Sequence, residues 1–205
     1  MVKRFGKSPE GKRLQRIKSS PHFRDGCFKN VENTSVNPDD VSMFRILKKM
    51  IFRPSSVEPS EELPNIKPNL FSLDTNQNSV VWFGHSSYFI QLKDLKILVD
   101  PVFSGNASPF RFFGKAFKGA DHFNAEDFPS IDLLILTHDH YDHLDYPTIK
   151  KLHEKVTTVV TSLGVGAHLE TWGVKNDKIR ELDWWEEHEV NPNRSEERRV
   201  GKECP

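Results

Sequence analysis

The sequence predicts an α/β domain that follows an irregular N-terminal extension. Short β-type runs begin at Ser79, and from residue 131 onward apolar strand-like runs alternate with segments of helical spacing. This alternation is typical of a layered sheet with helices packed against it. Residues 1–38 differ, because charged residues, Ser, Asn and Pro dominate them and no sustained periodicity is present.

The N-terminal extension, residues 1–78, is predicted to contain one short helix and a linker. Residues 1–38 are expected to be irregular. The helix is expected to follow an aspartate that can cap it, Asp39 or Asp40. Its apolar residues share one face at helical spacing: Phe44, Leu47 and Ile51. Residues 54–68 hold four prolines and are predicted to be a linker.

Basic charge is concentrated at the N-terminus. Nine Lys and Arg lie within residues 1–30 against Glu10 and Asp25, although the 29 basic and 29 acidic residues of the whole chain balance. We expect a solvated arm and no nucleic-acid partner, with peripheral contact to an anionic membrane as the alternative. No apolar stretch follows these charges, and no run approaches the roughly 18 apolar residues of a membrane span. We therefore expect a cytoplasmic protein; its oligomeric state is not indicated.

The predicted domain, residues 79–190, begins with a strand meander. The β-type runs are residues 80–83, 88–92 and 96–99. A long loop rich in phenylalanine follows, between Asp100 and Ile131. Two explanations are open for this loop, because its aromatic side chains can cover a pocket or plug the core beneath it.

Alternating strands and helices are predicted for the rest of the domain. Residues 132–136 form a short apolar run suited to a buried strand, and this run leads directly into a histidine cluster. Pro147 occupies a first helical position, which begins a helix. The elements predicted after it are a strand at 157–161, a helix at 165–172 closed by Gly173, and strands near 179–182 and 185–190.

The histidine cluster, residues 137–143, has the sequence Thr-His-Asp-His-Tyr-Asp-His and the pattern H-x-H-x-D-H. Imidazole nitrogens and carboxylate oxygens are the ligands that zinc prefers where the metal stays reactive. His138 and His140 are predicted to hold one ion, and Asp142 and His143 a second, so the expected cofactor is two Zn²⁺ ions. A histidine-rich surface loop without metal gives no reason for this order of residues.

A hydrolytic role follows from that metal chemistry. Zinc lowers the pKa of bound water from about 15.7 toward about 7, which provides hydroxide at neutral pH. Asp142 is the catalytic candidate, either as a ligand that orients the nucleophile or as a proton acceptor. His85, Asp100 and Asp145 are predicted to support the ligands or contact the substrate, with turn or helix-cap roles as the alternatives.

Four segments resemble the metallo-β-lactamase superfamily, and within it the branch that includes N-acyl-phosphatidylethanolamine phospholipase D. They are residues 82–87, 97–104, 131–136 and 137–145. The resemblance implies a four-layer αββα sandwich with the metals at one edge of the two sheets, of which this chain is the N-terminal half. It also implies a third histidine, a bridging aspartate and a last histidine from downstream segments that are not in this sequence.

Residues 191–205 do not resemble the next strand of the family and are predicted to be a non-native tail. On that basis the chain is a fragment, expected to aggregate and to be inactive by itself. The function expected of the intact protein is metal-dependent hydrolysis of a small-molecule or lipid phosphodiester. Hydrolysis of a lactone or other ester, and metal binding without catalysis, are the alternatives.

Overall fold

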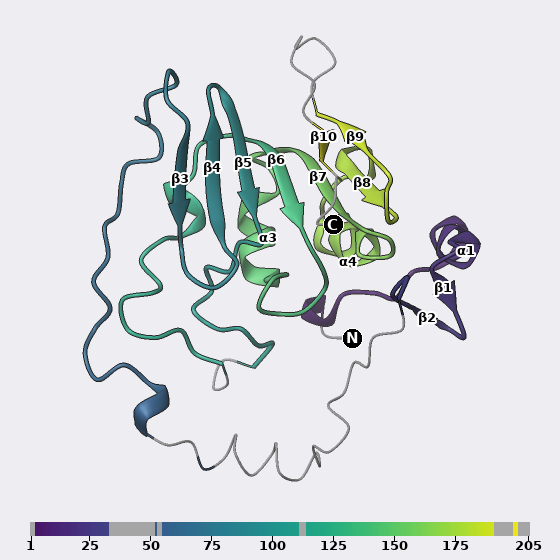
Figure 1. The fold of residues 1–205 in the computed structure, drawn as a ribbon, viewed down its shortest axis with the longest axis horizontal. Helices are drawn as coiled ribbons and strands as arrows, with labels where there is room; N and C mark the ends of the chain where they lie inside the picture. The colour runs from purple at the N-terminus through teal and green to yellow at the C-terminus, as the bar shows by residue number, and fades with distance from the viewer. Residues whose placement is uncertain (1–2, 33–51, 53–54, 111–113, 191–198, 201–205) are drawn as a thin grey trace.

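A single mixed sheet organises the part of the chain that this computed structural model describes, residues 3–32, 52, 55–110, 114–190 and 199–200 (Figure 1). Its strand order is β3-β4-β5-β6-β7-β8. The antiparallel strands are β3 (Ser79–Trp82), β4 (Tyr88–Leu92) and β5 (Leu95–Val99). Parallel to β5 run β6 (Ile131–Leu136), β7 (Val156–Ser162) and β8 (Ile179–Leu182). This arrangement confirms the predicted α/β class.

Two crossover helices cover one face of the parallel strands. α3 (Tyr146–Leu152) follows β6, and α4 (Gly166–Trp172) follows β7. Pro147 lies in the first turn of α3, and Gly173 ends α4 with φ of 103°, where a side chain is disfavoured. The larger core cluster joins helices and sheet, and its members include Phe89, Leu98, Leu134, Ile149, Leu152, Leu169 and Trp172.

The opposite face of the sheet carries a second apolar cluster. Its buried members are Leu95, Ile97, Val99, Leu133 and Val160. The strand register extends this face onto the edge strand β3, since Val80 pairs with Ile90 and Trp82 pairs with Tyr88. Val80 and Trp82 are 70% and 67% exposed. The described residues thus form one β layer and one helical layer of the implied sandwich.

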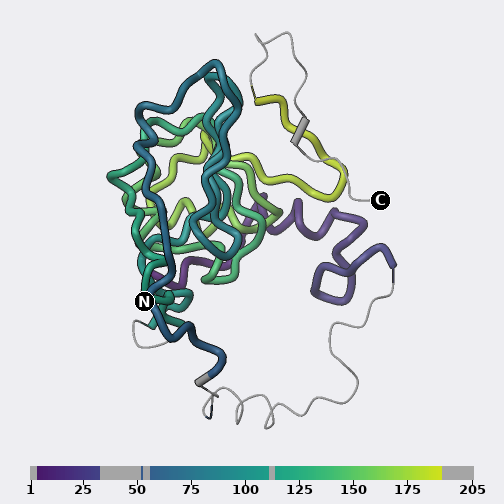
Figure 2. Tube along the Cα trace, turned by 60° about the vertical axis from the view of Figure 1, so that its left-hand side comes forward, coloured from purple at the N-terminus to yellow at the C-terminus, as the bar shows by residue number. Residues whose placement is uncertain are grey.

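The prediction that residues 1–38 are irregular is wrong for the described part of that range. It contains η1 (Lys3–Phe5), α1 (Gly11–Ser19) and a hairpin of β1 (Phe23–Arg24) and β2 (Cys27–Phe28). In both views α1 lies beside α4 and β8 (Figures 1 and 2). Arg13 bonds Glu181 at 2.6 Å and Glu170 at 2.8 Å, and Ile17 is buried. These tertiary contacts stabilise a helix too short and too polar to be recognised by periodicity.

Smaller differences concern the linker and the last strands. The helix predicted around Phe44 lies outside the described residues, and the linker contains η2 (Ser55–Val57). The remaining short helices are η3 (Ala125–Asp127) and η4 (Asn176–Lys178). The strand predicted at 185–190 is reduced to β9 (His188–Glu189), which pairs with β10 (Arg199–Val200); Trp185 has φ of 70°, which is incompatible with a strand.

Among the described helices, none combines the length and the apolar character needed to cross a membrane.

Candidate metal centre and active site

The histidine cluster forms a turn directly after β6, and we call residues 138–143 the metal loop. The amides of His143 and Leu144 both donate to the His140 carbonyl oxygen, at 3.0 and 2.7 Å. This turn folds the end of the loop back toward its beginning. The ring centroid of His138 therefore lies 4.6 Å from that of His140 and 4.0 Å from that of His143.

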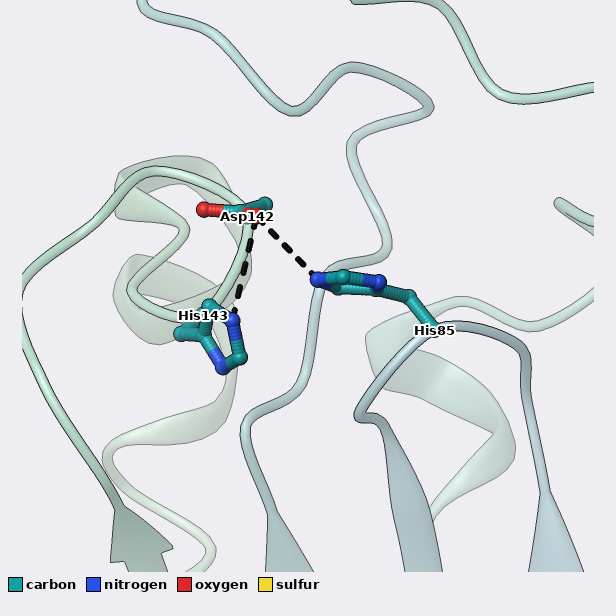
Figure 3. Close-up of side chains that lie close together, drawn as sticks. All are labelled: His85, Asp142 and His143. Atoms are coloured by element: carbon teal, nitrogen blue, oxygen red, sulfur yellow. Dashed lines mark hydrogen bonds and ion pairs between the residues drawn. The ribbon is translucent and has the colours of Figure 1, made fainter. Parts of the chain in front are cut away.

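Asp142, His143 and His85 form a compact group of potential ligand atoms (Figure 3). Asp142 Oδ2 lies 3.1 Å from His85 Nε2 and 3.8 Å from His143 Nε2, and one ligand atom of each residue falls within 4.8 Å of the others. Tetrahedral ligands about 2.1 Å from a zinc ion are about 3.4 Å apart. The separations in this group therefore fit a shared cation. Of the residues predicted to hold the other ion, His138 lies beside His143 and His140 lies beside His138, and the group of ligand atoms includes neither of them.

Asp100 is the buried acceptor that organises these imidazoles. It is 1% exposed, has φ of 41°, and lies at the end of β5 next to the end of β6. Its Oδ1 accepts from the Thr137 amide at 2.8 Å, and its Oδ2 lies 2.8 Å from His143 Nδ1. Oδ2 is an acceptor in this arrangement, so His143 donates to it from Nδ1. The other ring nitrogen, Nε2, then presents its lone pair toward Asp142.

Through Thr137, Asp100 also determines which ring nitrogen of His138 carries the hydrogen. The Thr137 hydroxyl donates its one hydrogen to Asp100 Oδ2 at 2.6 Å. It must therefore accept from His138 Nδ1, which lies 3.0 Å away. His138 consequently also carries its hydrogen on Nδ1 and leaves Nε2 free for a metal. One buried carboxylate thus selects the tautomer of two predicted ligands.

The protonation states of the loop favour cation binding. Burial, together with the neighbouring His143 and His140 rings, lowers the pKa of His138, and the neutral imidazole is the form that binds metal. Burial acts to raise the pKa of Asp142. Its own backbone amide and the nearby His143 and His85 outweigh burial and hold the Asp142 pKa below the usual value. Asp142 therefore stays ionised to lower pH than an ordinary aspartate, and the ionised carboxylate is the form that binds a metal.

His85 reaches the group from the turn between β3 and β4. It has φ of 46°, in the left-handed region that costs a non-glycine residue about 1–3 kcal/mol. Trp82 Nε1 donates to the His85 carbonyl oxygen at 3.0 Å. The buried Ser87 hydroxyl donates to the Asp100 carbonyl oxygen and accepts from the Val102 amide. These bonds hold the strained turn against the strand end that carries Asp100.

Asp145 supports the site from a distance. It is buried, and its Oδ2 accepts from the Ser104 amide at 3.0 Å and from the Thr148 hydroxyl at 2.5 Å. Burial raises the pKa of Asp145 even though these hydrogen bonds act in the opposite direction. Asp145 therefore ties the start of α3 to the chain that follows β5. It is not part of the group of ligand atoms.

A cavity of about 440 Å³ opens beside His85 and Asp142. Part of its lining comes from residues 105–107 and 114–117 of a small hairpin, and we call residues 105–110 and 114–117 the pocket hairpin. The Ala107 amide donates to the Gly114 carbonyl oxygen at 2.7 Å, and the Ala116 amide donates to the Gly105 carbonyl oxygen at 3.0 Å. Among the described residues that line the cavity, Lys115 is the one lysine or arginine.

Both explanations of the phenylalanine-rich loop hold, at different residues. Phe117 lines the cavity. Phe103 instead stacks on the buried Phe128 with ring centroids 4.9 Å apart and packs against the core. Phe112 and Phe113 lie outside the described residues.

Three contributors were absent from the predicted site: Thr137, Ser87 and Lys115. Thr137 had a usable signal, because a polar residue directly after a buried strand and directly before a ligand is placed to bond both. Ser87 follows His85 closely in sequence, but its bond to the Asp100 carbonyl depends on the tertiary fold. Nothing in the sequence around Lys115 marks it as a cavity residue.

Comparison with known proteins decides the family. A profile described as "Beta-lactamase superfamily domain" matches residues 96–198, half of the chain. The chain belongs to the metallo-β-lactamase superfamily. The matched segment contains β6, the whole metal loop and all of β5 except Leu95, whereas His85 lies before it.

Three relatives of the superfamily illustrate the range of similarity. An uncharacterized protein of Mycobacterium tuberculosis is 34% identical over 174 residues, which are 84% of this chain and 47% of the relative. The N-acyl-phosphatidylethanolamine-hydrolyzing phospholipase D 1 of Caenorhabditis elegans is 30% identical, over 71% of this chain and 45% of its own length. A UPF0173 metal-dependent hydrolase of Agrobacterium fabrum is 33% identical over 46% of this chain and 36% of its own. This chain spans about half the length of the first two relatives.

Proposed function

We propose that this site hydrolyses phosphodiesters with divalent cations held by His138, His140, Asp142 and His143. The observation that carries the proposal is the convergence of imidazole and carboxylate ligand atoms beside a cavity of about 440 Å³. Cations held there lower the pKa of water and supply a hydroxide nucleophile near neutral pH. Superfamily membership, and the name "metal-dependent hydrolase" of the Agrobacterium relative, support hydrolysis over metal storage.

The residues of the chain divide the work between binding and orientation. Asp142 is an ionised ligand at the edge of the cavity, placed to orient the nucleophile or accept its proton. His85 lines the same cavity and faces Asp142 from the opposite turn. Asp100 keeps the His143 ring, and through Thr137 the His138 ring, in the tautomer that binds a cation.

The cavity supports an anionic substrate with an apolar part. Most of its lining is apolar or backbone, including Phe83, Val102 and Phe117, and Lys115 offers a cation to a phosphate; the lining also contains the carboxylates of Asp121 and Asp142. The Caenorhabditis relative is named for hydrolysis of a phospholipid, which has both features. We therefore propose a phospholipid-like phosphodiester as the substrate class. The nitrogen and oxygen ligands favour zinc as the metal.

The substrate class is tested by comparing bis-p-nitrophenyl phosphate with a panel of neutral lactones. The protein for assay is the longest open reading frame that contains residues 1–190, loaded in turn with zinc, manganese or iron. We expect kcat/KM to be higher for the phosphodiester than for any lactone, and highest with zinc. Lys115→Ala should raise KM for the phosphodiester about tenfold, because a hydrogen bond to a charged group is lost.

The matched control is Lys118→Ala, which removes an exposed lysine three residues from Lys115 and outside the cavity lining. It should change KM less than twofold. Faster turnover of a lactone than of the phosphodiester would indicate that the substrate is a lactone or another ester. Tight metal binding with no hydrolysis of either substrate would instead mark a non-catalytic metal-binding protein.

A further inference from the structure

The N-terminal segment contacts the pocket hairpin, of which residues 105–107 and 114–117 line the cavity. We call residues 4–7 the strap. The Arg4 guanidinium donates from Nη1 to the carbonyl oxygen of Pro109 in the pocket hairpin. The Phe5 ring meets the ring of Phe110 in the same hairpin edge to face, with centroids 6.2 Å apart. Two neighbouring strap residues therefore contact Pro109 and Phe110 of a hairpin more than 100 residues away in sequence.

Phe5 also contacts the metal loop. Its ring is nearly perpendicular to that of Tyr141, at an interplanar angle of 88° and a centroid distance of 6.5 Å. Tyr141 directly precedes the ligand Asp142 in the chain. Edge-to-face aromatic pairs are favourable beyond the area that they bury. Through one side chain, the strap thus joins the pocket hairpin to the loop that carries the ligands.

The strap packs closely against α4, and this contact fixes its position. Gly6 has φ of 66°, and a Cβ at this position would fall 1.9 Å from Nδ1 of His168. The Lys7 amide donates to that same His168 Nδ1 at 3.1 Å. The other nitrogen of His168, Nε2, lies 3.9 Å from Oδ2 of Asp139 in the metal loop. A residue larger than glycine therefore cannot occupy position 6 unless the His168 side chain or the strap is displaced.

We propose that the strap positions the active site by clamping the pocket hairpin to the metal loop, with Phe5 as the positioning residue. The clamp sets the separation between Lys115 in the hairpin and Asp142 in the loop, which lie on the same cavity. Its consequence for turnover rests on the proposed hydrolytic function. Its consequence for the hairpin does not, because the contacts join parts of this chain only.

Hydrogen exchange of the pocket hairpin tests the clamp without substrate or metal. The informative amides are those of Ala107 and Ala116, which are hydrogen-bonded across the hairpin. In Phe5→Ala and in Gly6→Ala, we expect both amides to exchange about tenfold faster, because local opening no longer breaks the aromatic contacts. Phe5→Tyr keeps the ring and should restore exchange to within about twofold of the original rate.

Two controls separate the clamp from general loosening of the fold. Phe71→Ala removes another exposed phenylalanine, in the segment before β3, and should leave exchange at Ala107 and Ala116 unchanged. The Leu134 amide in β6 reports the core and should be unaffected in every variant. Unchanged hairpin exchange in Phe5→Ala, with the Lys7 amide exchanging faster, would overturn the proposal. So would equal acceleration at Leu134.

A kinetic readout connects the clamp to the proposed function. Phe5→Ala should raise KM for bis-p-nitrophenyl phosphate about fivefold with kcat nearly unchanged, because the hairpin that carries Lys115 moves while the ligands stay. Faster hairpin exchange with no change in KM would confine the strap to a structural role and contradict its positioning role. If the protein hydrolyses no substrate, the exchange measurement still decides whether the clamp exists.

Discussion

Replacing Asp142 by alanine is expected to lower kcat for phosphodiester hydrolysis about a thousandfold. The substitution removes both a ligand and the carboxylate that orients or deprotonates the nucleophile, and positioned proton transfer alone contributes about 10²–10⁴-fold. Asp142→Asn keeps the size of the side chain and should lose nearly as much, because the amide carries no negative charge. The measurement is kcat at saturating substrate, with the metal content of each variant determined in parallel.

A matched control for Asp142 lies in the same loop. Asp139 is exposed, whereas Asp142 is half-buried, and the Asp139 carboxylate lies 3.9 Å from His168 and outside the group of ligand atoms. Asp139→Ala should therefore change kcat less than about threefold, in the range of surface substitutions. An equal loss in both variants would show that the loop responds to any loss of charge, and that Asp142 has no special chemical role.

The second large effect is expected at Asp100. Asp100→Ala removes the acceptor of the Thr137 amide, the Thr137 hydroxyl and His143 Nδ1 at a position that is 1% exposed. We expect the free energy of unfolding to fall by about 2–4 kcal/mol, since three partly buried hydrogen bonds lose their shared acceptor. Zinc affinity should fall about 10- to 100-fold, because the ligand tautomers are no longer selected. Urea unfolding and zinc titration measure the two effects.

Asp100→Asn distinguishes packing from tautomer selection. Its amide oxygen can still accept from the Thr137 amide, but the NH₂ group is a donor and can accept from neither Thr137 Oγ1 nor His143 Nδ1. Stability should therefore recover in part while zinc affinity stays low. Glu126→Ala removes a carboxylate that pairs with Lys151 on the surface at 3.5 Å and should alter stability by less than about 0.5 kcal/mol. Normal zinc affinity in Asp100→Asn would contradict the tautomer argument.

The regular elements of the domain were predictable because their signals are local. The bounds of β4 and β8 agree with the strands predicted from the sequence, and Pro147 and Gly173 lie at the ends of α3 and α4 where the sequence places them. The helix α1 was missed because its stability comes from partners far away, above all the Arg13 pairs with Glu170 and Glu181. Local helix propensity does not depend on such long-range pairs, so it does not predict this helix.

In the candidate site, too, some residues are predictable from the sequence and others depend on the tertiary fold. The order of His138, His140, Asp142 and His143 indicates metal binding from sequence alone, whereas the arrival of His85 beside Asp142 depends on how the β3–β4 turn folds over the sheet. The control of the tautomers by Asp100 arises because β5 and β6 are parallel neighbours, which brings Asp100 next to Thr137 across the sheet edge. Sheet register is a tertiary property, and residue spacing does not contain it.

The central claim is that the metal loop exists to bind divalent cations. Its most direct test is the metal content of the protein after incubation with zinc and exhaustive dialysis, measured by elemental analysis beside a variant with His138, His140 and His143 changed to alanine. We expect the unaltered protein to retain at least one zinc ion per chain and the triple variant to retain none. Equal zinc content in the two proteins, or none in the unaltered one, would contradict it.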